Sequence, residues 1–313
     1  MIVETAPDAL DAERIEAVAR AAEVADGVAP LGEQPLRALH GGAEARAVRH
    51  LVARAGGAEG EPVGYAQIDG TGDDATVELV VHPDHRRQGI GAQLLRAVLE
   101  REPAAAVWAH GDLPSAVALA GSVGLTRTRE LLKMRRRGSE GPALPERRAV
   151  EGIELGTLAE AVSEGGERWP GMDARSEFLR VNNAAFHWHP EQGGWTAAQL
   201  DERLAVDWVD TGAVFLAVDT SGGPRLAGFH WTKTVAEPGE PVEGEVYVVA
   251  VDPADQGRGL GGVLTSVGVE YLEGPAGAES VVLYVEGDNR PAIRTYERLG
   301  FGVEHVDVTY TSR

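Results

Sequence analysis

The sequence predicts an α/β fold made of two tandem domains, and the main observation behind this prediction is an internal repeat. Residues 78–95 resemble residues 248–265, and residues 110–125 resemble residues 286–301. The offset between matching segments is slightly larger for the second pair than for the first, and one loop of modest length can account for the difference. A second observation is the order of elements in each copy, strands first and then strand and helix in alternation. That order favours a mixed sheet with helices on both faces.

Length and composition agree with two domains. The 313 residues suffice for two cores, and we expect a first domain over 1–140, a second over 150–313, and a Gly- and Pro-rich linker at 138–148. The formal net charge of −20 argues against nucleic acid or an anionic membrane as partner. Cysteine is absent, which excludes disulfides and thiolate chemistry. Neither a signal peptide nor a long apolar run is present, so we expect a soluble, cytoplasmic protein, and a monomer because the repeat already pairs two copies.

The first copy begins with a hairpin-like region at residues 51–68. A buried strand is expected at 77–81, a helix follows through the apolar positions of 94–99, and a short strand is expected at 106–109. The dense basic run KMRRR at 133–137 is interpreted as the solvated end of an edge strand.

The second copy repeats this order, with a hairpin-like region at 214–234 and a Val-rich strand at 245–251 that Pro253 ends. Apolar residues at helical spacing predict a helix over 260–271. A strand is expected at 281–285, and a helix at 292–299 that ends before Gly300.

A glycine-rich loop joins the central strand to the helix in each copy, RRQGIG at 86–91 and QGRGLG at 256–261. Glycines before a helix let a phosphate group approach unpaired backbone amides at the positive end of the helix dipole. One such loop is weak evidence, but two in matching contexts favour a pyrophosphate site. The spacing is neither that of a dinucleotide-binding loop nor that of a P-loop.

These residues resemble the GNAT family of acetyl-CoA-dependent N-acetyltransferases. Both loops fit the family signature [QR]xxGx[GA], and NRPAIRTYERLGF at 289–301 resembles its second signature, an Asn followed by a helix that carries a Tyr. Within the family the chain looks like the tandem mycothiol synthases, because similar segments lie outside the cofactor loops, at 26–39, 179–196, 228–233 and 244–253. The resemblance implies acetylation of the cysteinyl amine of a cysteinyl-glucosaminyl-inositol, giving mycothiol and CoA as the last step of mycothiol biosynthesis, without a metal.

Amide formation from a thioester needs a base for the ammonium, a donor for the carbonyl oxygen and an acid for the thiolate. Glu245 is the candidate base, acting directly or through water, and alternation along the strand predicts that it shares a face with Tyr247 and Val249. Tyr296 is the candidate acid, and the backbone amide near Val249 is the candidate donor.

The resemblance also implies the contacts of acetyl-CoA. In the second half these are Val249, Ala250, Val251, Gln256, Gly257, Arg258, Gly259, Leu260, Gly261, Gly262, Asn289, Arg290, Pro291, Ala292, Ile293 and Arg294. In the first half they are Leu79, Val80, Val81, Arg87, Gln88, Gly89, Ile90, Gly91 and Ala92. The implied acceptor contacts are Glu33, Glu191, Lys233, Glu245 and Tyr284.

The first half lacks the catalytic side chains. By the repeat alignment Ala75 stands in place of Glu245, Leu113 in place of Asn289 and Ala120 in place of Tyr296. That half is therefore expected to be inert, and it either binds acetyl-CoA without transfer or serves as a scaffold. Glu78 is interpreted as an ordinary strand-end charge on the wrong face for a base.

Two other functions stay open. A tandem GNAT enzyme could acetylate another amine, such as an aminoglycoside or a protein amino terminus, and a chain of this kind could also sense acetyl-CoA without turnover. Trp188, Trp195 and Trp231 could form the floor of a sugar site, although aromatic residues more often fill cores.

Overall fold

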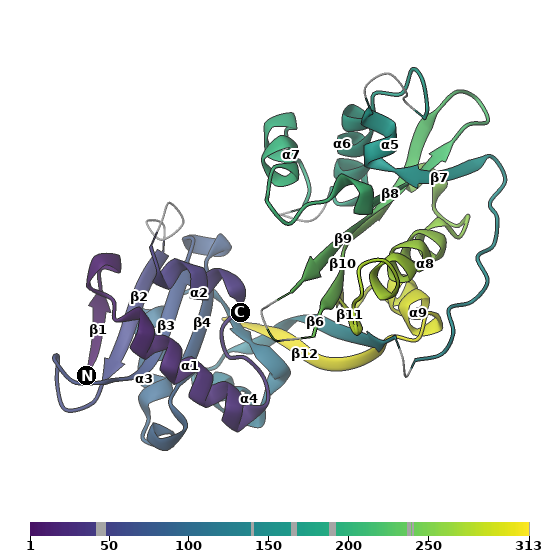
Figure 1. Ribbon diagram of the computed structural model, residues 1–313. Helices are drawn as coiled ribbons and strands as arrows, with labels where there is room; N and C mark the ends of the chain where they lie inside the picture. The colour runs from purple at the N-terminus through teal and green to yellow at the C-terminus, as the bar shows by residue number, and fades with distance from the viewer. Residues whose placement is uncertain are drawn as a thin grey trace. The chain divides into compact units, whose positions relative to one another are not determined.

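The computed structural model describes residues 1–41, 48–138, 141–163, 168–187, 192–236, 239 and 241–312. The chain divides into two compact units, of which unit 1 comprises Met1–Leu131 and His305–Arg313 and unit 2 comprises Leu132–Glu304. The predicted mixed α/β architecture is confirmed in both units (Figure 1).

Unit 1 contains a sheet with helices on both faces. Its elements are β1 (Ile2–Thr5), α1 (Ala12–Asp26), α2 (Glu33–Leu39), β2 (Val48–Arg54), β3 (Pro62–Asp69), β4 (Thr76–Val81), α3 (Ile90–Leu99), β5 (Ala106–Ala109), α4 (Pro114–Ser122) and the start of β6 (Thr126–Arg137). The strand order is β1-β2-β3-β4-β5-β12-β6, in which β12 is Gly302–Thr311, and only the β4–β5 register among those described here is parallel.

Helix α1 illustrates how the sequence sets this arrangement. Asp11 accepts a hydrogen bond from the Arg14 amide at its start, and Gly27 adopts a left-handed conformation (φ 73°) at its end. Its buried residues recur at helical spacing and pack on Val52, Tyr65 and Val80, whereas α3 packs on the opposite face of the same strands. Figure 1 shows α1 crossing the strands.

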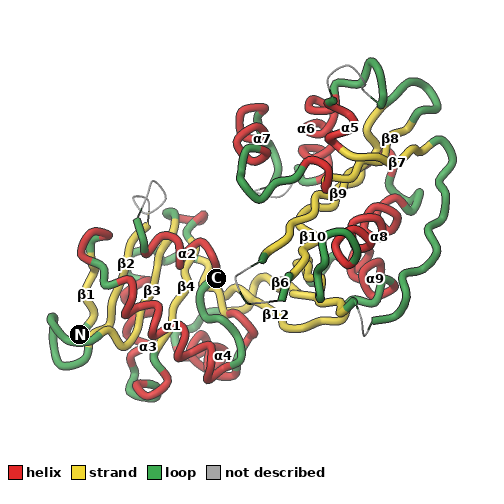
Figure 2. The backbone as a smooth tube through the Cα atoms, viewed as in Figure 1, coloured by secondary structure: helices red, strands yellow, loops and turns green. Residues whose placement is uncertain are grey.

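Unit 2 repeats the plan. Its elements are β7 (Ile153–Thr157), α5 (Leu158–Val162), α6 (Ala174–Ala185), α7 (Ala197–Leu204), β8 (Val214–Asp219), β9 (Arg225–Val235), β10 (Glu243–Val251), α8 (Leu260–Glu273), β11 (Ser280–Glu286), α9 (Arg290–Arg298) and the start of β12 (Gly302–Thr311). Its strand order is β12-β6-β11-β10-β9-β8-β7, with β10 and β11 parallel. Helices cover the strands on both faces here as well (Figure 2).

Helix α8 packs closely on β9 at one glycine. A Cβ atom added to Gly268 would lie 2.1 Å from the His230 ring, so a glycine at this position lets the helix approach the strand. The ring donates a hydrogen bond from Nδ1 to the Leu264 carbonyl over 2.8 Å. Burial lowers the pKa of His230 to about 4, so the ring is neutral at physiological pH.

Strands β6 and β12 are each shared by both units, because β6 starts in unit 1 and ends in unit 2 and β12 does the reverse. The prediction that KMRRR ends a solvated edge strand is wrong, because β6 lies between β12 and β11. Arg135 contacts Glu243 and Glu304, and the buried Arg136 pairs with Glu273 and donates to the Leu299 carbonyl. Ion pairs within unit 2 thus account for Lys133, Arg135 and Arg136, whereas Arg137 is exposed.

Candidate active site

The central parallel strands are paired over only part of their length in both units. In unit 2 the β10–β11 register covers Glu243–Glu245 and Ser280–Val282, although both strands continue beyond it. In unit 1 the β4–β5 register covers two residue pairs, Thr76 with Ala106 and Val77 with Val107. Separated strands leave backbone groups on β10 past Glu245 and on β4 past Val77 that an extended ligand can pair with.

A β-bulge in β10 follows Glu245 and sets the faces of the residues beyond it. The register of β10 with β9 shifts between Val246 and Val248, so Tyr247 is the extra residue. Gly244 faces Leu272 of α8, which places Glu245 on the other face of the strand. Tyr247 lies on that other face too, since its ring contacts Trp208 and Trp231.

The expectation that Val249 shares this face is wrong. Val249 and Val251 pack with Leu260 and Leu264 of α8, whereas Val248 and Ala250 pack in the core beneath α6. The bulge reverses the alternation after Tyr247, and a count by twos from Glu245 misses that reversal.

Glu245 is held beside a cation. The Lys233 Nζ lies 3.8 Å from the Glu245 Oε2, and both side chains are mostly buried, at 18 % and 17 % exposed. Lys233 pairs with Glu245 across the β9–β10 register, which explains why the two side chains meet. The structure thus brings together two of the residues that sequence reasoning assigned to the acceptor.

Helix α9 carries the candidate acid. Asn289 caps this helix by accepting a hydrogen bond from the Ala292 amide over 3.2 Å, and Gly300 follows its end with φ 86°. The predicted contacts at 289–294 form the cap and first turn of this helix. Burial raises the pKa of Tyr296 to about 12, so its hydroxyl is protonated at neutral pH.

The glycine loop of unit 2 leads directly into α8. Gly257 and Gly259 adopt left-handed backbone conformations, with φ 83° and 85°, and no described atom lies within 4 Å of an added Cβ at either. The residues of 256–262 therefore form an open loop and the first turn of the helix, where unpaired amides suit a pyrophosphate. The Arg258 guanidinium is bound to Asp219 and Asp255, so only its backbone is available for a phosphate.

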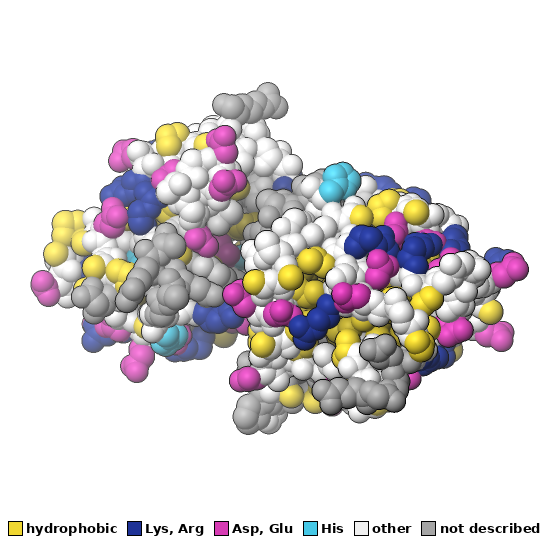
Figure 3. Space-filling model, turned by 90° about the horizontal axis from the view of Figure 1, so that it is seen from above, with side chains coloured by type: hydrophobic (Ala, Val, Ile, Leu, Met, Phe, Trp, Pro, Cys, Tyr) yellow, Lys and Arg dark blue, Asp and Glu magenta, His cyan; other side chains and the backbone are white. Residues whose placement is uncertain are grey.

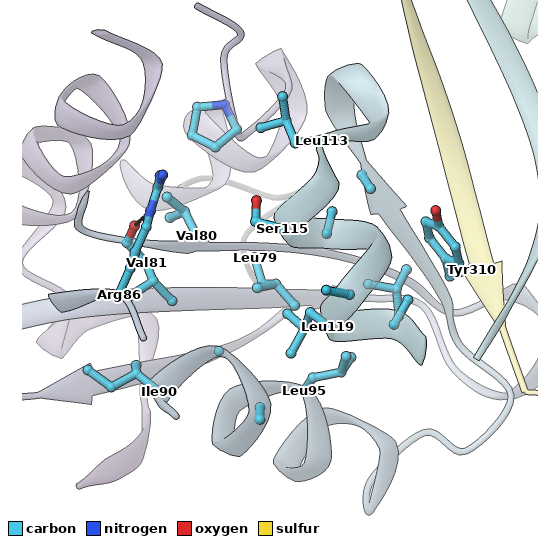
Figure 4. A pocket seen from close by; sticks show the side chains of 18 of the residues that line it. Leu79, Val80, Val81, Arg86, Ile90, Leu95, Leu113, Ser115, Leu119 and Tyr310 are labelled. Carbon is cyan, nitrogen blue, oxygen red and sulfur yellow. Dashed lines mark hydrogen bonds between the residues drawn. The ribbon is translucent and has the colours of Figure 1, made fainter. Parts of the chain in front are cut away.

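The first half contains a cavity of about 490 Å³ at the corresponding place. All of the first-half residues predicted to contact acetyl-CoA line it except Gln88, whose amide donates to the Asp84 carbonyl. Figure 4 shows Leu79, Leu95 and Leu119 among its apolar side chains, with Arg86 at one end and Tyr310 at the other. The cavity is apolar along its length, as a pantetheine arm requires, and at one end the Arg86 guanidinium is paired with Asp26.

A buried ionic cluster borders this cavity. His110 Nε2 lies 3.1 Å from Glu78 Oε2, and His110 Nδ1 lies 3.4 Å from Asp307 Oδ1. Glu78 also accepts a hydrogen bond from the Gly32 amide over 2.6 Å, and Asp307 accepts one from the Gly111 amide over 2.9 Å. Sequence reasoning missed this cluster, because Asp307 is nearly 200 positions from His110 in the chain.

The interpretation of Glu78 as an ordinary charge on the wrong face is therefore corrected. Leu79 and Val81 pack against the α3 side of β4, so Glu78 lies on the opposite side, equivalent to the side that Glu245 occupies in unit 2. The carboxylate is already bound to His110 and to Gly32, which removes it as a base.

Two other predicted acceptor contacts, Glu33 and Tyr284, are exposed. Glu33 is the exposed first residue of α2 in unit 1, near Arg37. Tyr284 is 47 % exposed on β11, with the Lys133 Nζ 6.0 Å from its ring centroid. Glu191 and Trp188 lie outside the described residues. Trp195 and Trp231 are buried in the core, so neither forms an exposed floor.

The described surface shows neither a patch of one charge on the face drawn in Figure 3 nor a group of metal-binding side chains. The face in Figure 3 carries acidic and basic side chains intermixed. Among the described residues no His, Asp and Glu side chains form a group able to hold a metal ion, and none of the described helices is both long and apolar enough to span a membrane.

Comparisons with known proteins agree with this geometry. A family model for a GNAT acetyltransferase domain matches residues 46–120, and the model of the acetyltransferase (GNAT) family matches residues 180–301. Two solved structures share the fold over 99 % of this chain: a GCN5-related N-acetyltransferase from Sphaerobacter thermophilus (TM-score 0.70, 23 % identity, 94 % of that chain) and a tandem GNAT protein from the clavulanic acid biosynthesis pathway (TM-score 0.65, 20 % identity, 97 % of that chain).

Curated relatives match along almost the whole chain. The mycothiol acetyltransferase of Gordonia bronchialis is 47 % identical over 96 % of this chain and 91 % of its own length. Those of Rhodococcus erythropolis and Nocardia farcinica are also 47 % identical, over 96 % and 97 % of this chain and 95 % of their own lengths. With two GNAT domains and this identity, the chain belongs to the mycothiol acetyltransferase family.

Proposed function

We propose that this chain is a mycothiol synthase, which transfers the acetyl group of acetyl-CoA to the cysteinyl amine of cysteinyl-glucosaminyl-inositol and releases mycothiol and CoA. The observation that supports the proposal is the position of Glu245, which lies beside Lys233 where the β10–β11 pairing ends, in a chain of this family. The long matches outside the cofactor loops favour this acceptor over an aminoglycoside or a protein amino terminus.

Acetyl-CoA supplies an activated thioester, and the residues of unit 2 suit its parts. The amides of the 256–262 loop and of the first turn of α8 would bind the pyrophosphate, and the free edge of β10 at 249–251 would pair with the pantetheine arm. An amide near Val249 would donate to the carbonyl oxygen as negative charge develops there.

Two side chains would move or hold protons. The carboxylate of Glu245 would accept a proton from the ammonium, directly or through water, and the amine would then attack the carbonyl carbon as the C–S bond breaks. Tyr296 keeps its O–H because its pKa is raised to about 12, and it would donate a hydrogen bond to the departing thiolate. Full proton transfer from so weak an acid to a thiolate is uphill, so we expect Tyr296 to contribute less than Glu245.

We also propose that the first half binds acetyl-CoA without transferring the acetyl group. The 490 Å³ cavity and its lining support binding. The absence of transfer follows from the side chains, because Ala120 replaces Tyr296 and Glu78 is engaged by His110.

Acceptor recognition would use Glu33, Glu191, Lys233, Glu245 and Tyr284, whose carboxylates, ammonium and hydroxyl suit an amine linked to many hydroxyl groups.

We propose a cytoplasmic monomer that binds neither nucleic acid nor membrane, in keeping with the net charge of −20.

The test is acetyl transfer measured by product mass, because the acceptor carries its own thiol and would react with a thiol dye. The panel contains cysteinyl-glucosaminyl-inositol, free cysteine, glucosamine, an aminoglycoside and a short peptide. We expect rapid N-acetylation of the first compound alone. Faster turnover of another amine would refute the proposed acceptor, and binding of acetyl-CoA without any turnover would instead support a sensor.

A further inference from the structure

A cluster of aromatic side chains lies next to the candidate base in unit 2. The ring centroid of Trp208, which follows α7, lies 5.2 Å from that of Tyr247, and the two rings are nearly perpendicular. Both rings rest on Trp231, at 6.1 and 5.7 Å. Trp231 is buried, whereas Tyr247 is 40 % exposed and Trp208 is partly exposed. The cluster therefore has a buried base and two accessible rings.

The cluster is joined to the charged pair of the site. Lys233 Nζ lies 5.5 Å from the centroid of Trp208 and 5.9 Å from that of Tyr247, and it also lies 3.8 Å from Glu245 Oε2. One ammonium thus contacts the carboxylate and both accessible rings. Glu245 and Tyr247 share this face by ordinary strand alternation, and the bulge at Tyr247 brings the buried Val248 to the same side.

Core packing explains Trp231 and the inner side of Trp208, which packs against the same cluster, but it does not explain Tyr247. Tyr247 is 40 % exposed in the middle of a central strand, beside the partly exposed Trp208. A smaller or polar residue at position 247 would expose less apolar surface to water. Flat aromatic rings present an apolar face at little cost in side-chain entropy, which suits the C–H face of a sugar ring. An ammonium held over such rings can donate to ring hydroxyls.

The dimensions fit the acceptor. In a cysteinyl amide the reacting nitrogen is separated from the first sugar ring by one residue and one further bond, or roughly 5 Å when extended. The Lys233 ammonium links the two ends of this span, because it lies 3.8 Å from Glu245 Oε2 and 5.5 and 5.9 Å from the two ring centroids. An amine directed at Glu245 would therefore bring its sugar within reach of Trp208 and Tyr247.

We propose that Trp208 and Tyr247, with Lys233, form a carbohydrate subsite that binds the sugar ring of the acceptor and makes the enzyme specific for sugar-bearing amines. This inference rests on the proposed function and adds its specificity determinants. Sequence reasoning considered other tryptophans for this role, and the two that the structure describes, Trp195 and Trp231, are buried.

The test compares two acceptors in each variant: cysteinyl-glucosaminyl-inositol and cysteine amide, which keeps the amine but lacks the sugar. We expect Trp208→Leu and Tyr247→Leu each to lower the ratio of kcat/KM for the first acceptor to that for the second by about tenfold, because a ring face and its buried contact area are lost. Trp208→Phe should restore most of the ratio. Trp169→Phe, a change at a buried tryptophan in the same core, is the matched control and should leave the ratio as in the parent.

Inhibition provides a second readout. Glucosaminyl-inositol, which has the sugar but no amine to acetylate at the cysteinyl position, should compete with the acceptor in the parent chain and about tenfold more weakly in Trp208→Leu. Equal losses on both acceptors, or a raised KM for acetyl-CoA, would overturn the subsite and assign these rings to packing. If the parent chain acetylates neither acceptor, the proposed function fails instead, and saturation-transfer NMR with glucosaminyl-inositol still tests the subsite.

Discussion

Replacing His110 by Asn should remove a pH-dependent contribution to the stability of unit 1. His110 is 18 % exposed and lies between the carboxylates of Glu78 and Asp307. Burial alone would lower the pKa of His110, but the adjacent carboxylates of Asp307 and Glu78 outweigh burial and raise this pKa to about 9. The imidazolium is therefore stabilised by folding.

The size of the effect follows from the shift. A rise from 6.5 to about 9, at roughly 1.4 kcal/mol for each pKa unit, corresponds to about 3 kcal/mol of folding free energy. Because the folded pKa is raised, this contribution is complete below pH 6.5, declines as the pH rises toward 9 and is lost above 9. The lowered pKa of Asp307 reflects the same interaction from the other partner and is not added.

Amide hydrogen exchange over peptides from β4 and β5 measures this stability apart from that of unit 2. The free energy of opening in the parent should exceed that in His110→Asn by about 3 kcal/mol more at pH 6 than at pH 9.5. His187→Asn, a change at an exposed histidine in unit 2, is the control and should be neutral at both pH values. A His110 effect that is the same at pH 6 and pH 9.5 would refute the ionic account of the cluster.

Three further predictions concern the two sites. Glu245→Gln should lower kcat by about a hundredfold or more with little change in acetyl-CoA binding, and equal losses in both would indicate a structural role. Tyr296→Phe should lower kcat by about tenfold. Because the pKa of Tyr296 is about 12, the parent chain should not lose activity between pH 8 and 10 through deprotonation of this hydroxyl. A loss of activity in that range that is absent in Tyr296→Phe would contradict this expectation. Gly89→Val and Gly259→Val each replace a glycine with a left-handed backbone conformation, and each should reduce the number of acetyl-CoA molecules bound per chain, measured by calorimetry, from two to one. Only Gly259→Val should abolish turnover. A parent chain that binds one acetyl-CoA would show that the first half is a scaffold.

The repeat and the positions of its main elements could be predicted because they depend on local patterns. Apolar spacing places a helix over 260–271, within the observed Leu260–Glu273, and Gly300 ends α9 as expected. The strands 245–251 and 281–285 fall within β10 and β11. Periodicity and glycine positions are properties of a short window, so one sequence suffices to read them.

The exchange of β6 and β12 could not be predicted in the same way. Which strand pairs with which depends on contacts between residues far apart in the chain, and KMRRR has the composition of an edge strand until Glu243, Glu273 and Glu304 are brought to it. The predicted boundary at 138–148 separates the two repeats along the chain. The compact units do not divide there, because β6 and β12 each begin in one unit and end in the other.

The candidate site was predictable in its residue types but not in its faces. The pairing of Glu245 with Lys233 is a cross-strand contact whose register the sequence does not state. The extra residue at Tyr247 reverses the alternation of side chains along β10. A count by twos from Glu245 therefore predicts the wrong face for Val249. The same reasoning misjudged Glu78, and only the fold brings His110 and Asp307 to it.

The central claim is that acetyl transfer to the cysteinyl amine takes place in the second half alone. The most direct measurement is single-turnover acetylation of cysteinyl-glucosaminyl-inositol, followed by product mass, in the matched variants Glu245→Gln and Glu78→Gln. We expect Glu78→Gln to form N-acetylated product at close to the parent rate and Glu245→Gln to be slower by about a hundredfold or more. Full activity in Glu245→Gln together with loss in Glu78→Gln would contradict the account and move the reaction to the first half.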